Sequence, residues 1–198
     1  MGKVVGIDLT GSEKRPSGYA VLWEDGKVYT ARVKTDDELV ERIWNDHPDI
    51  ISIDSPLSLP EDSTKIYRDC ELTLKRRGIG VYWCLLPSMK ALTMRGISLA
   101  ARLRSAGVRV IESYPGAAQD ILGIPRKNKG IQALAEALAG YGIKGDLDVS
   151  HDELDAITSA IVGKLYLEGK YEALGCLIIP RKESQGGPPR VSAVRSRR

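Results

Sequence analysis

The sequence predicts one α/β domain built on a mixed sheet with helices on both faces. Three observations lead to this fold class. The first 33 residues contain three strand-like runs joined by turns, helical and strand-like segments alternate from residue 36 onward, and the chain of 198 residues has the length of a single domain. A chain of this size buries roughly 70% of its unfolded surface, so it needs no disulfide or structural metal to fold.

The N-terminal segment predicts a meander of three antiparallel strands. Residues 4–9 form a mostly apolar run that is typical of a buried strand. Residues 19–23 predict a second strand and residues 27–33 a third, in which side chains alternate between two faces. Asp25-Gly26, between these two runs, is a strong hairpin signal. The domain therefore opens with antiparallel pairing.

The remainder of the chain predicts helices interleaved with short strands. Helical spacing of apolar residues covers 36–44, and the apolar run 50–54 follows it, an order that favours a parallel crossover. A second apolar run, at 108–113, predicts a further buried strand. The other predicted elements are helices at 67–77, 88–105, 117–122, 131–141 and 150–168 and a final strand at 176–179.

The positive charge of the chain is concentrated at its C-terminal end. The formal net charge is +3, and residues 181–198 alone contain six basic residues and one acid. This segment is also rich in Gly, Pro and Ser and has too few apolar residues to form a core. We therefore expect a folded domain at 1–180 and a basic disordered tail at 181–198. Such a tail either binds nucleic acid loosely through counterion release or has no specific partner.

The cysteine pattern indicates a reducing compartment. The three cysteines are widely separated and form neither a CxxC pair nor a metal-ligand spacing with the two histidines. No apolar run approaches the ~20 residues of a membrane span, and the chain begins without a charged-then-apolar signal segment. We expect a cytoplasmic protein with free thiols and no membrane partner.

Acidic residues follow the predicted buried strands. Asp8 and Asp54 each come directly after an apolar Ile, and Glu112 lies near the end of a third strand. Ligands bind at the carboxyl ends of strands in open α/β sheets, so neighbouring strands would bring these carboxylates together. Crowded carboxylates repel unless a cation compensates them, and Mg²⁺ prefers oxygen ligands. The alternatives are caps for the following turns and, for Glu112, an ordinary surface acid.

The last long helix carries two more candidate acids. Ser150 and Glu153 form a capping-box pattern, and Asp152 in the first turn suits the helix dipole. Asp155 lies beyond the first turn at the border of a buried stripe, where an acid is costly unless it is paired or bound to a metal. The alternative for Asp155 is a salt bridge to a Lys or Arg.

Two other patterns leave further functions open. In the segment 6–12, an Asp followed by Thr, Gly and Ser resembles the phosphate loop of sugar-kinase and actin-like ATPases. A group of cations could contact a phosphate backbone or simply face solvent, with Glu71 and Lys75 as an ordinary i,i+4 pair. These cations are Arg68, Lys75, Arg76, Arg77, Lys90 and Arg95.

An ordered set of motifs, spread over residues 3–180, resembles an uncharacterised family described as predicted ribonuclease-H-like nucleases. The motifs are Gly6-Ile7-Asp8-Leu9 with Gly11-Ser12 and Pro16-Ser17-Gly18, Ile53-Asp54-Ser55-Pro56-Leu57, Arg68-Asp69-Cys70-Glu71 ending in Gly78, Pro87-Ser88, Glu112-Ser113-Tyr114-Pro115, and Asp152-Glu153-Leu154-Asp155-Ala156. Ribonuclease-H-like enzymes place one acid on the first strand, one on the fourth and one or two on a late helix. The resemblance implies this fold, with Asp8, Asp54 and Asp155 as catalytic metal ligands.

The resemblance further implies helper roles for Asp152, as a metal ligand, and for Glu112, as a catalytic residue. The resulting hypothesis is a nuclease that hydrolyses phosphodiester bonds of nucleic acid with Mg²⁺ or Mn²⁺. Two ions about 4 Å apart would activate a water and stabilise the leaving oxygen, with Asp8 bridging them. The alternatives are a non-catalytic nucleotide or nucleic-acid binding module and an actin- or sugar-kinase-like ATP-dependent phosphotransferase. The sequence leaves a homodimer open.

Overall fold

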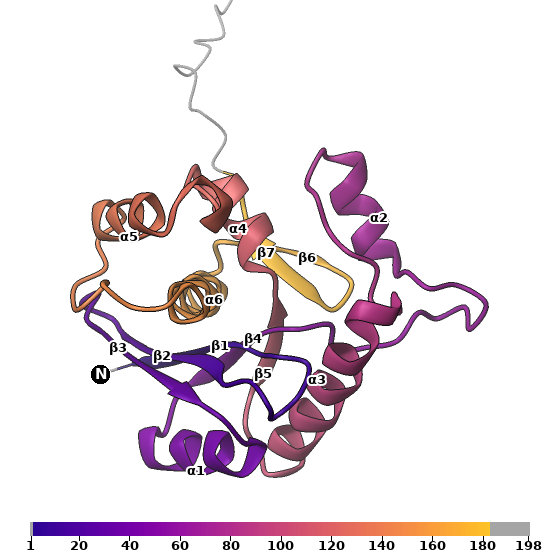
Figure 1. The fold of residues 1–198 in the computed structure, drawn as a ribbon, viewed down its shortest axis with the longest axis horizontal. Coiled ribbons are helices and arrows are strands. Elements are labelled where there is room, and N and C mark those ends of the chain that lie inside the picture. The colour runs from indigo at the N-terminus through magenta and orange to yellow at the C-terminus, as the bar shows by residue number, and fades with distance from the viewer. Residues whose placement is uncertain (1, 183–198) are drawn as a thin grey trace, which may run out of the picture.

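A computed structural model of the chain describes residues 2–182. These residues form one seven-stranded mixed sheet in the order β3-β2-β1-β4-β5-β7-β6, with helices on both faces (Figure 1). The predicted α/β class is confirmed. Apart from Arg181 and Lys182, the predicted basic tail lies outside the described residues. Within residues 2–182, no helix combines the length and the apolar character needed to cross a membrane.

The predicted N-terminal meander is present. Strands β1 (Lys3–Asp8), β2 (Ser17–Trp23) and β3 (Val28–Val33) pair antiparallel in sequence order. The hairpin between β2 and β3 turns at Gly26, whose φ of 85° lies in the left-handed region that glycine adopts without a steric penalty. The Asp-Gly signal therefore marks the turn correctly.

The rest of the sheet is built by crossovers and a C-terminal hairpin. Strand β4 (Ile50–Asp54) pairs parallel with β1, and β5 (Val110–Ser113) pairs parallel with β4. Strand β7 (Leu177–Pro180) lies parallel to β5, and β6 (Tyr171–Leu174) closes the edge as its antiparallel neighbour. The sequence did not predict β6, because this short edge strand is only partly buried and lacks an apolar run.

The helices agree with their predictions within a few residues at each end. They are α1 (Asp36–Asp46), α2 (Asp69–Arg76), α3 (Pro87–Ser105), α4 (Pro115–Leu122), α5 (Ile131–Gly140) and α6 (His151–Leu167), with a short 3-10 helix, η1 (Lys127–Lys129), between α4 and α5. The capping box predicted for α6 is present: the Ser150 side chain accepts from the backbone of Glu153, and the Glu153 side chain accepts from Ser150 N.

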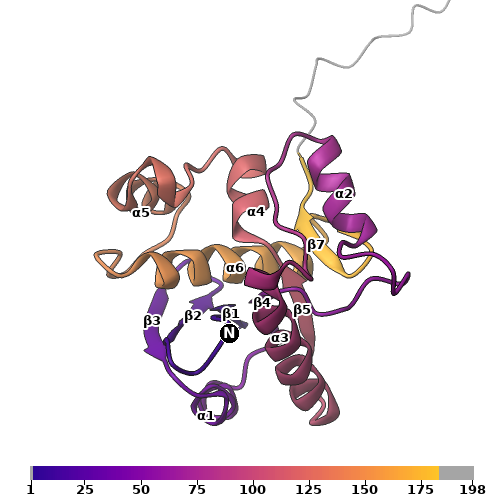
Figure 2. The ribbon, with the colours of Figure 1, turned by 45° about the vertical axis from the view of Figure 1, so that its right-hand side comes forward.

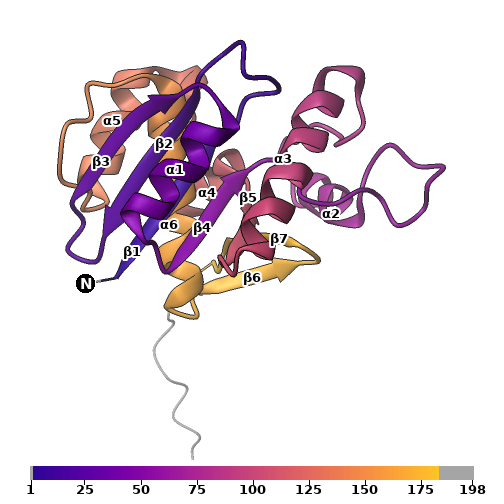
Figure 3. The ribbon, with the colours of Figure 1, turned by 90° about the horizontal axis from the view of Figure 1, so that it is seen from below.

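The two faces of the sheet are covered by different helices. Val5 and Ile7 of β1 belong to an apolar cluster with residues of α1 and α3, whereas Val4 belongs to a cluster with residues of α5 and α6. This separation follows from the alternation of side chains along a strand. Figure 3 shows α1 lying across one face, and Figure 2 shows α6 on the other with α4 and α5 outside it. The prediction of helices on both faces is confirmed.

Helix α6 lies unusually close to the sheet because two glycines face it. A Cβ at Gly6 would overlap the backbone of Ala156 and Ala160, and a Cβ at Gly18 would overlap the carbonyl group of Asp152. The absence of side chains at these positions lets the helix backbone contact β1 and β2 directly. The first turns of α6 are thereby placed above the ends of these strands.

Candidate functional site

Asp8 and Asp54 lie side by side at the end of the sheet. They are the last residues of β1 and β4, and they are direct partners in the parallel register. Because alternate residues share a face, Asp8 leaves the sheet on the same side as Gly6, which contacts α6. The structure thus brings together two carboxylates that the sequence placed only at separate strand ends.

Helix α6 adds two more acids to this position. Gly18 is the register partner of Asp8, and it touches the backbone of Asp152. Asp155, one helical turn further on, is only 5% exposed. Burial raises the pKa of Asp8 well above its ordinary value, and repulsion from Asp54, Asp155 and Asp152 raises it further. These four aspartates, the acidic cluster, therefore interact across three segments of the chain.

The same repulsion acts on Asp54. Burial raises the pKa of Asp54 well above its ordinary value, and the negative charge of Asp155 raises it further. Lys127 opposes both effects, since its ammonium group lowers the pKa of Asp54 and of Asp8. Carboxylates in this arrangement favour a cation, because adding positive charge stabilises their ionised forms.

Lys127 and Gln119 hold Asp155, and no pattern in the sequence indicates either residue. Lys127 Nζ lies 3.0 Å from Asp155 Oδ2, and Gln119 Nε2 donates to Asp155 Oδ1 at 2.8 Å. Burial alone would lower the pKa of Lys127, but the charges of Asp155, Asp8 and Asp152 raise it overall. The alternative considered for Asp155, a salt bridge to a lysine, is therefore present. No local pattern singles out Lys127, because only the fold brings η1 beside α6.

Asp152 is paired with a residue of its own helix. His151 Nε2 lies 2.9 Å from Asp152 Oδ1, and the Asp152 side chain remains partly exposed. This contact, together with the position of Asp152 in the first turn, agrees with the helix-end role considered for it. Asp152 nevertheless lies close enough to Asp8 to raise the pKa of that carboxyl group.

Glu112 does not join the four aspartates. In the register of β4 and β5 its partner is Ile53, and the partner of Asp54 is Ser113. Glu112 therefore leaves the sheet on the face of Ile53, opposite Asp8 and Asp54, although its negative charge still contributes to the raised pKa of Asp54. Its carboxylate accepts from Arg68 Nη2 at 2.7 Å, from Arg68 Nη1 at 2.8 Å and from the backbone N of Leu57 at 2.8 Å.

The environment of Glu112 is a buried ionic network. Arg68 is 8% exposed and also donates from Nε to Glu71 Oε1 at 2.9 Å. Glu71, itself 1% exposed, accepts from the backbone N of Cys84. The predicted pair of Glu71 with Lys75 is therefore wrong, because Glu71 faces the interior and Lys75 lies over the ring of Trp83, 3.7 Å from its centroid.

Two of the cations considered for phosphate contact are buried in contacts with the protein itself. Arg68 belongs to the buried network, and the guanidinium of Arg95 contacts Asp36 Oδ1 at 2.8 Å and donates to the carbonyl of Thr10. The prediction of phosphate contact is therefore wrong for these two residues. The Thr10 hydroxyl closes its own loop by donating to the carbonyl of Arg15 at 2.8 Å. Arg95 thus anchors the loop between β1 and β2, which contains the pattern that resembles a phosphate loop.

The donor set of the acidic cluster fits a hard divalent cation. Its side chains offer only carboxylate oxygens, which Mg²⁺ and Mn²⁺ prefer. The Ser113 hydroxyl, at the register partner of Asp54, is buried and has no hydrogen-bond partner. Within residues 2–182, however, no three His, Cys, Asp or Glu side chains are already arranged to hold a metal ion. Lys127 instead holds one oxygen of Asp155.

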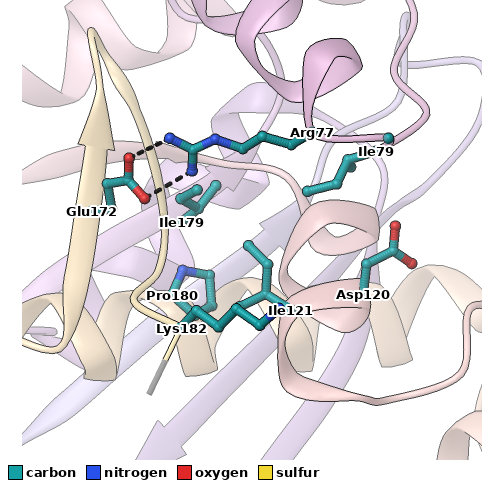
Figure 4. Close-up of a pocket in the computed structure, with 9 residues that line it drawn as sticks. Arg77, Ile79, Asp120, Ile121, Glu172, Ile179, Pro180 and Lys182 are labelled. Carbon is teal, nitrogen blue, oxygen red and sulfur yellow. Dashed lines mark hydrogen bonds and ion pairs between the residues drawn. The ribbon is translucent and has the colours of Figure 1, made fainter. Parts of the chain in front are cut away.

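Two cavities lie near the ends of α4. A cavity of about 500 Å³ is lined by Gln119, which holds Asp155, together with Arg126, Asn128 and Lys129. A cavity of about 530 Å³ lies between α2, α4 and the C-terminal hairpin, where Arg77 pairs with Glu172 (Figure 4). Neither of these two cavities is lined by any of the four aspartates.

The fold is ribonuclease-H-like, and its similarity to one solved structure agrees with this. Thermus thermophilus RuvC in complex with Holliday junction substrate matches with a TM-score of 0.54 and 14% identity, over 84% of this chain and 96% of that chain. A second Thermus thermophilus RuvC structure has 16% identity and a TM-score of 0.49, with the same coverage. No curated protein matches the sequence. The chain belongs to the family described as "Protein of unknown function (DUF429)", whose model matches residues 6–176.

Proposed function

We propose that this protein is a divalent-metal-dependent nuclease that hydrolyses phosphodiester bonds of nucleic acid at the acidic cluster. One observation carries the proposal: Asp8, Asp54, Asp152 and Asp155 converge from two strands and a helix closely enough to raise the pKa of Asp8 and Asp54. The shared fold with a RuvC structure that contains a Holliday junction supports nucleic acid as the partner.

The four aspartates would hold the metal. A divalent ion bound there would lower the pKa of a water and neutralise charge on a phosphate. Asp8 and Asp54 come from rigid central strands, and Asp152 and Asp155 from a helix packed directly on the sheet. A site on such elements keeps its carboxylates in a fixed geometry, which catalysis by positioned charges requires.

The neighbouring polar residues would orient one carboxylate and bind the substrate. Gln119 is buried and fixes Oδ1 of Asp155. Lys127, whose side chain is 49% exposed, occupies Oδ2 and has to leave that oxygen before a cation can take it. Once released, Lys127 would be an ammonium beside the site, and Lys129 lies in the same turn. Such cations favour a phosphate backbone.

The test is cleavage of labelled single-stranded, duplex, hybrid and branched substrates in Mg²⁺ or Mn²⁺. We expect cleavage by the unmodified protein and its loss in Asp8→Asn and Asp155→Asn. Asp37→Asn is the matched control, since the Asp37 side chain is 85% exposed and pairs with Arg102 on the opposite face of the sheet. Cleavage that persists unchanged in Asp8→Asn would contradict the proposal.

The same experiment distinguishes the binding module from the nuclease. A protein that binds these substrates in a salt-dependent manner, without cleaving any of them in either metal, would use the fold for binding only. A loss of cleavage in both aspartate variants with binding retained would instead support the assigned roles. Binding is measured on the same labelled substrates by fluorescence anisotropy at several salt concentrations.

A further inference from the structure

Two cysteines meet at a second site, far apart in sequence and outside the acidic cluster. Cys70 is a buried residue in the first turn of α2, and Cys176 is an exposed residue in the turn between β6 and β7. Both side chains line the same cavity, and the two thiols interact with each other there. Neither thiol contributes to the function proposed above, and no pattern in the sequence indicates that they are neighbours.

The Cys176 sulfur lies among polar groups that can stabilise a thiolate. Ser58 Oγ is 3.1 Å and Arg68 Nη1 is 3.3 Å from this sulfur. The Cys176 thiol also donates a hydrogen bond to Glu112 Oε2 at 3.3 Å, a contact that favours the protonated thiol. Two donors and one acceptor therefore surround Cys176, in addition to the thiol of Cys70.

These contacts act on the two thiols in opposite directions. The interaction with Cys70 lowers the pKa of Cys176 to about 7, with help from Ser58 and Arg68 and despite burial and the charge of Glu112. The same interaction, together with burial, raises the pKa of Cys70. Cys176 is thus the thiol that ionises first, and Cys70 stays protonated beside it.

Small reagents can approach the pair from solvent. A cavity of about 390 Å³ is lined by Cys70 and Cys176 together with Ser58, Tyr67 and Arg68. A reactive thiolate that is accessible and lies next to a second thiol is the arrangement found in cysteines that form reversible disulfides.

We propose that Cys70 and Cys176 form a peroxide-reactive pair, in which Cys176 is oxidised first and Cys70 then closes a disulfide with it. In the first step the Cys176 thiolate attacks one oxygen of a peroxide. The O–O bond breaks, Cys176 becomes a sulfenic acid, and the other oxygen leaves as water after taking up a proton. In the second step the Cys70 thiol gives its proton to the sulfenic hydroxyl as its sulfur attacks the Cys176 sulfur, so that an S–S bond forms, the S–O bond breaks and the hydroxyl leaves as a second water. Two thiols lose two electrons in total, and the peroxide accepts them.

The disulfide would join α2 to the C-terminal hairpin. These two elements already pack together, and Arg77 at the end of α2 is ion-paired with Glu172 of β6. The crosslink would therefore join two elements that are already in contact, next to the network of Arg68 and Glu112. Cys84 supplies an internal control, because it is fully buried and donates to the carbonyl of Ile66.

The experiment treats the full chain with hydrogen peroxide at pH 7 and follows thiols and intact mass. We expect free thiols to fall from three to one, with a mass loss of about 2 Da that dithiothreitol reverses. Peptide mapping should place the bond between Cys70 and Cys176, and Cys84→Ser should form it at the unmodified rate. Cys176 is exposed and lies beside Arg68 and Ser58, whereas Cys84 is fully buried, so Cys176 should be oxidised at least about tenfold faster than Cys84.

Two variants separate the roles of the paired thiols. Cys70→Ser should stop at a sulfenic acid on Cys176 that a dimedone probe traps, whereas Cys176→Ser should leave Cys70 reduced over the same time. Retention of three thiols in the unmodified protein, a disulfide that involves Cys84, or equal oxidation of Cys70 in Cys176→Ser would each overturn the proposal. The outcome does not depend on nuclease activity, since the readout is the state of the sulfurs.

Discussion

Replacing Lys127 with Met removes the ammonium that neutralises the acidic cluster in the absence of metal. Methionine matches the four-atom stem of lysine without the ammonium, so Asp155 loses the contact of 3.0 Å at Oδ2 but keeps its hydrogen bond from Gln119. The remaining negative charges then repel one another without compensation, so the metal-free protein should become less stable. Binding of a divalent cation should reverse this effect, because the metal replaces the lost positive charge.

The magnitude follows from the geometry of the pair. Two unit charges at 3.0 Å attract by about 5 kcal/mol at an effective dielectric constant of about 20. Lys127 is 49% exposed, so water screens the pair and the net contribution falls to about 1–2 kcal/mol. In a chain of this length, that corresponds to a decrease in Tm of about 2–8 °C. A metal no longer has to break the pair, so affinity for Mn²⁺ should rise by about 5- to 30-fold.

The assay is thermal unfolding with chelator and with increasing Mn²⁺, together with calorimetric titration of Mn²⁺. Lys129→Met is the matched control, because Lys129 belongs to the same 3-10 helix but does not contact the aspartates in the described structure. We expect the control to match the unmodified protein in both measurements. At saturating Mn²⁺, Lys127→Met should reach the Tm of the unmodified protein.

Two results would refute this reasoning. An unchanged Tm of Lys127→Met in chelator would mean that the ammonium does not stabilise the cluster. Weaker Mn²⁺ binding by the variant would mean that Lys127 assists the metal instead of competing with it for Asp155.

Three further perturbations test the electrostatics and the packing of the fold. The pKa of Asp8 is raised on folding, so the stabilising contribution of its protonated form is complete below about pH 4 and is lost as the pH rises through the folded pKa. In chelator at pH 7, Asp8→Asn should therefore have a higher Tm than the unmodified protein. A Tm difference that does not shrink toward pH 4 would contradict this. Arg68→Met leaves two buried glutamates without their cation and should cost about 3–5 kcal/mol of unfolding free energy, measured by chemical denaturation. Arg77→Met, which removes an exposed pair, should cost less than about 1 kcal/mol. Similar losses in the two variants would argue against the buried network. Gly6→Ala should cost about 3 kcal/mol or more of unfolding free energy because its Cβ would overlap α6. Gly140→Ala, with open space around it, should be neutral or slightly stabilising. An unchanged Tm of Gly6→Ala would show that α6 does not lie as close to the sheet as described.

Much of the fold could be predicted because its signals are local. The alternation in β3, the Asp-Gly turn and the capping box of α6 each depend on residues a few positions apart. The positions of Asp8 and Asp54 at strand ends are likewise visible in the sequence, because each follows an apolar run. The short edge strand β6 was missed because its residues pair with β7 without forming a buried apolar pattern of their own.

The roles of the charged residues were harder to predict because they depend on register and on long-range packing. Glu112 and Asp54 look equivalent in sequence, yet an offset of one residue between their strands sends the two carboxylates to opposite faces of the sheet. Glu71 looked like a surface residue paired with Lys75, but Arg68 and Glu112 hold it in the interior. In each case the partner that decides the role lies on another element.

The sequence by itself determined where strands and helices form and which acids stand at their ends, since these depend on periodicity and on turn residues. Only the tertiary structure decided which acids meet, that Lys127 and Gln119 hold Asp155, and that Cys70 lies beside Cys176. The physical reason is that hydrogen-bonding patterns and hydrophobic spacing act over a few residues, whereas charge neutralisation acts across space between segments that only the packed sheet and helices bring together.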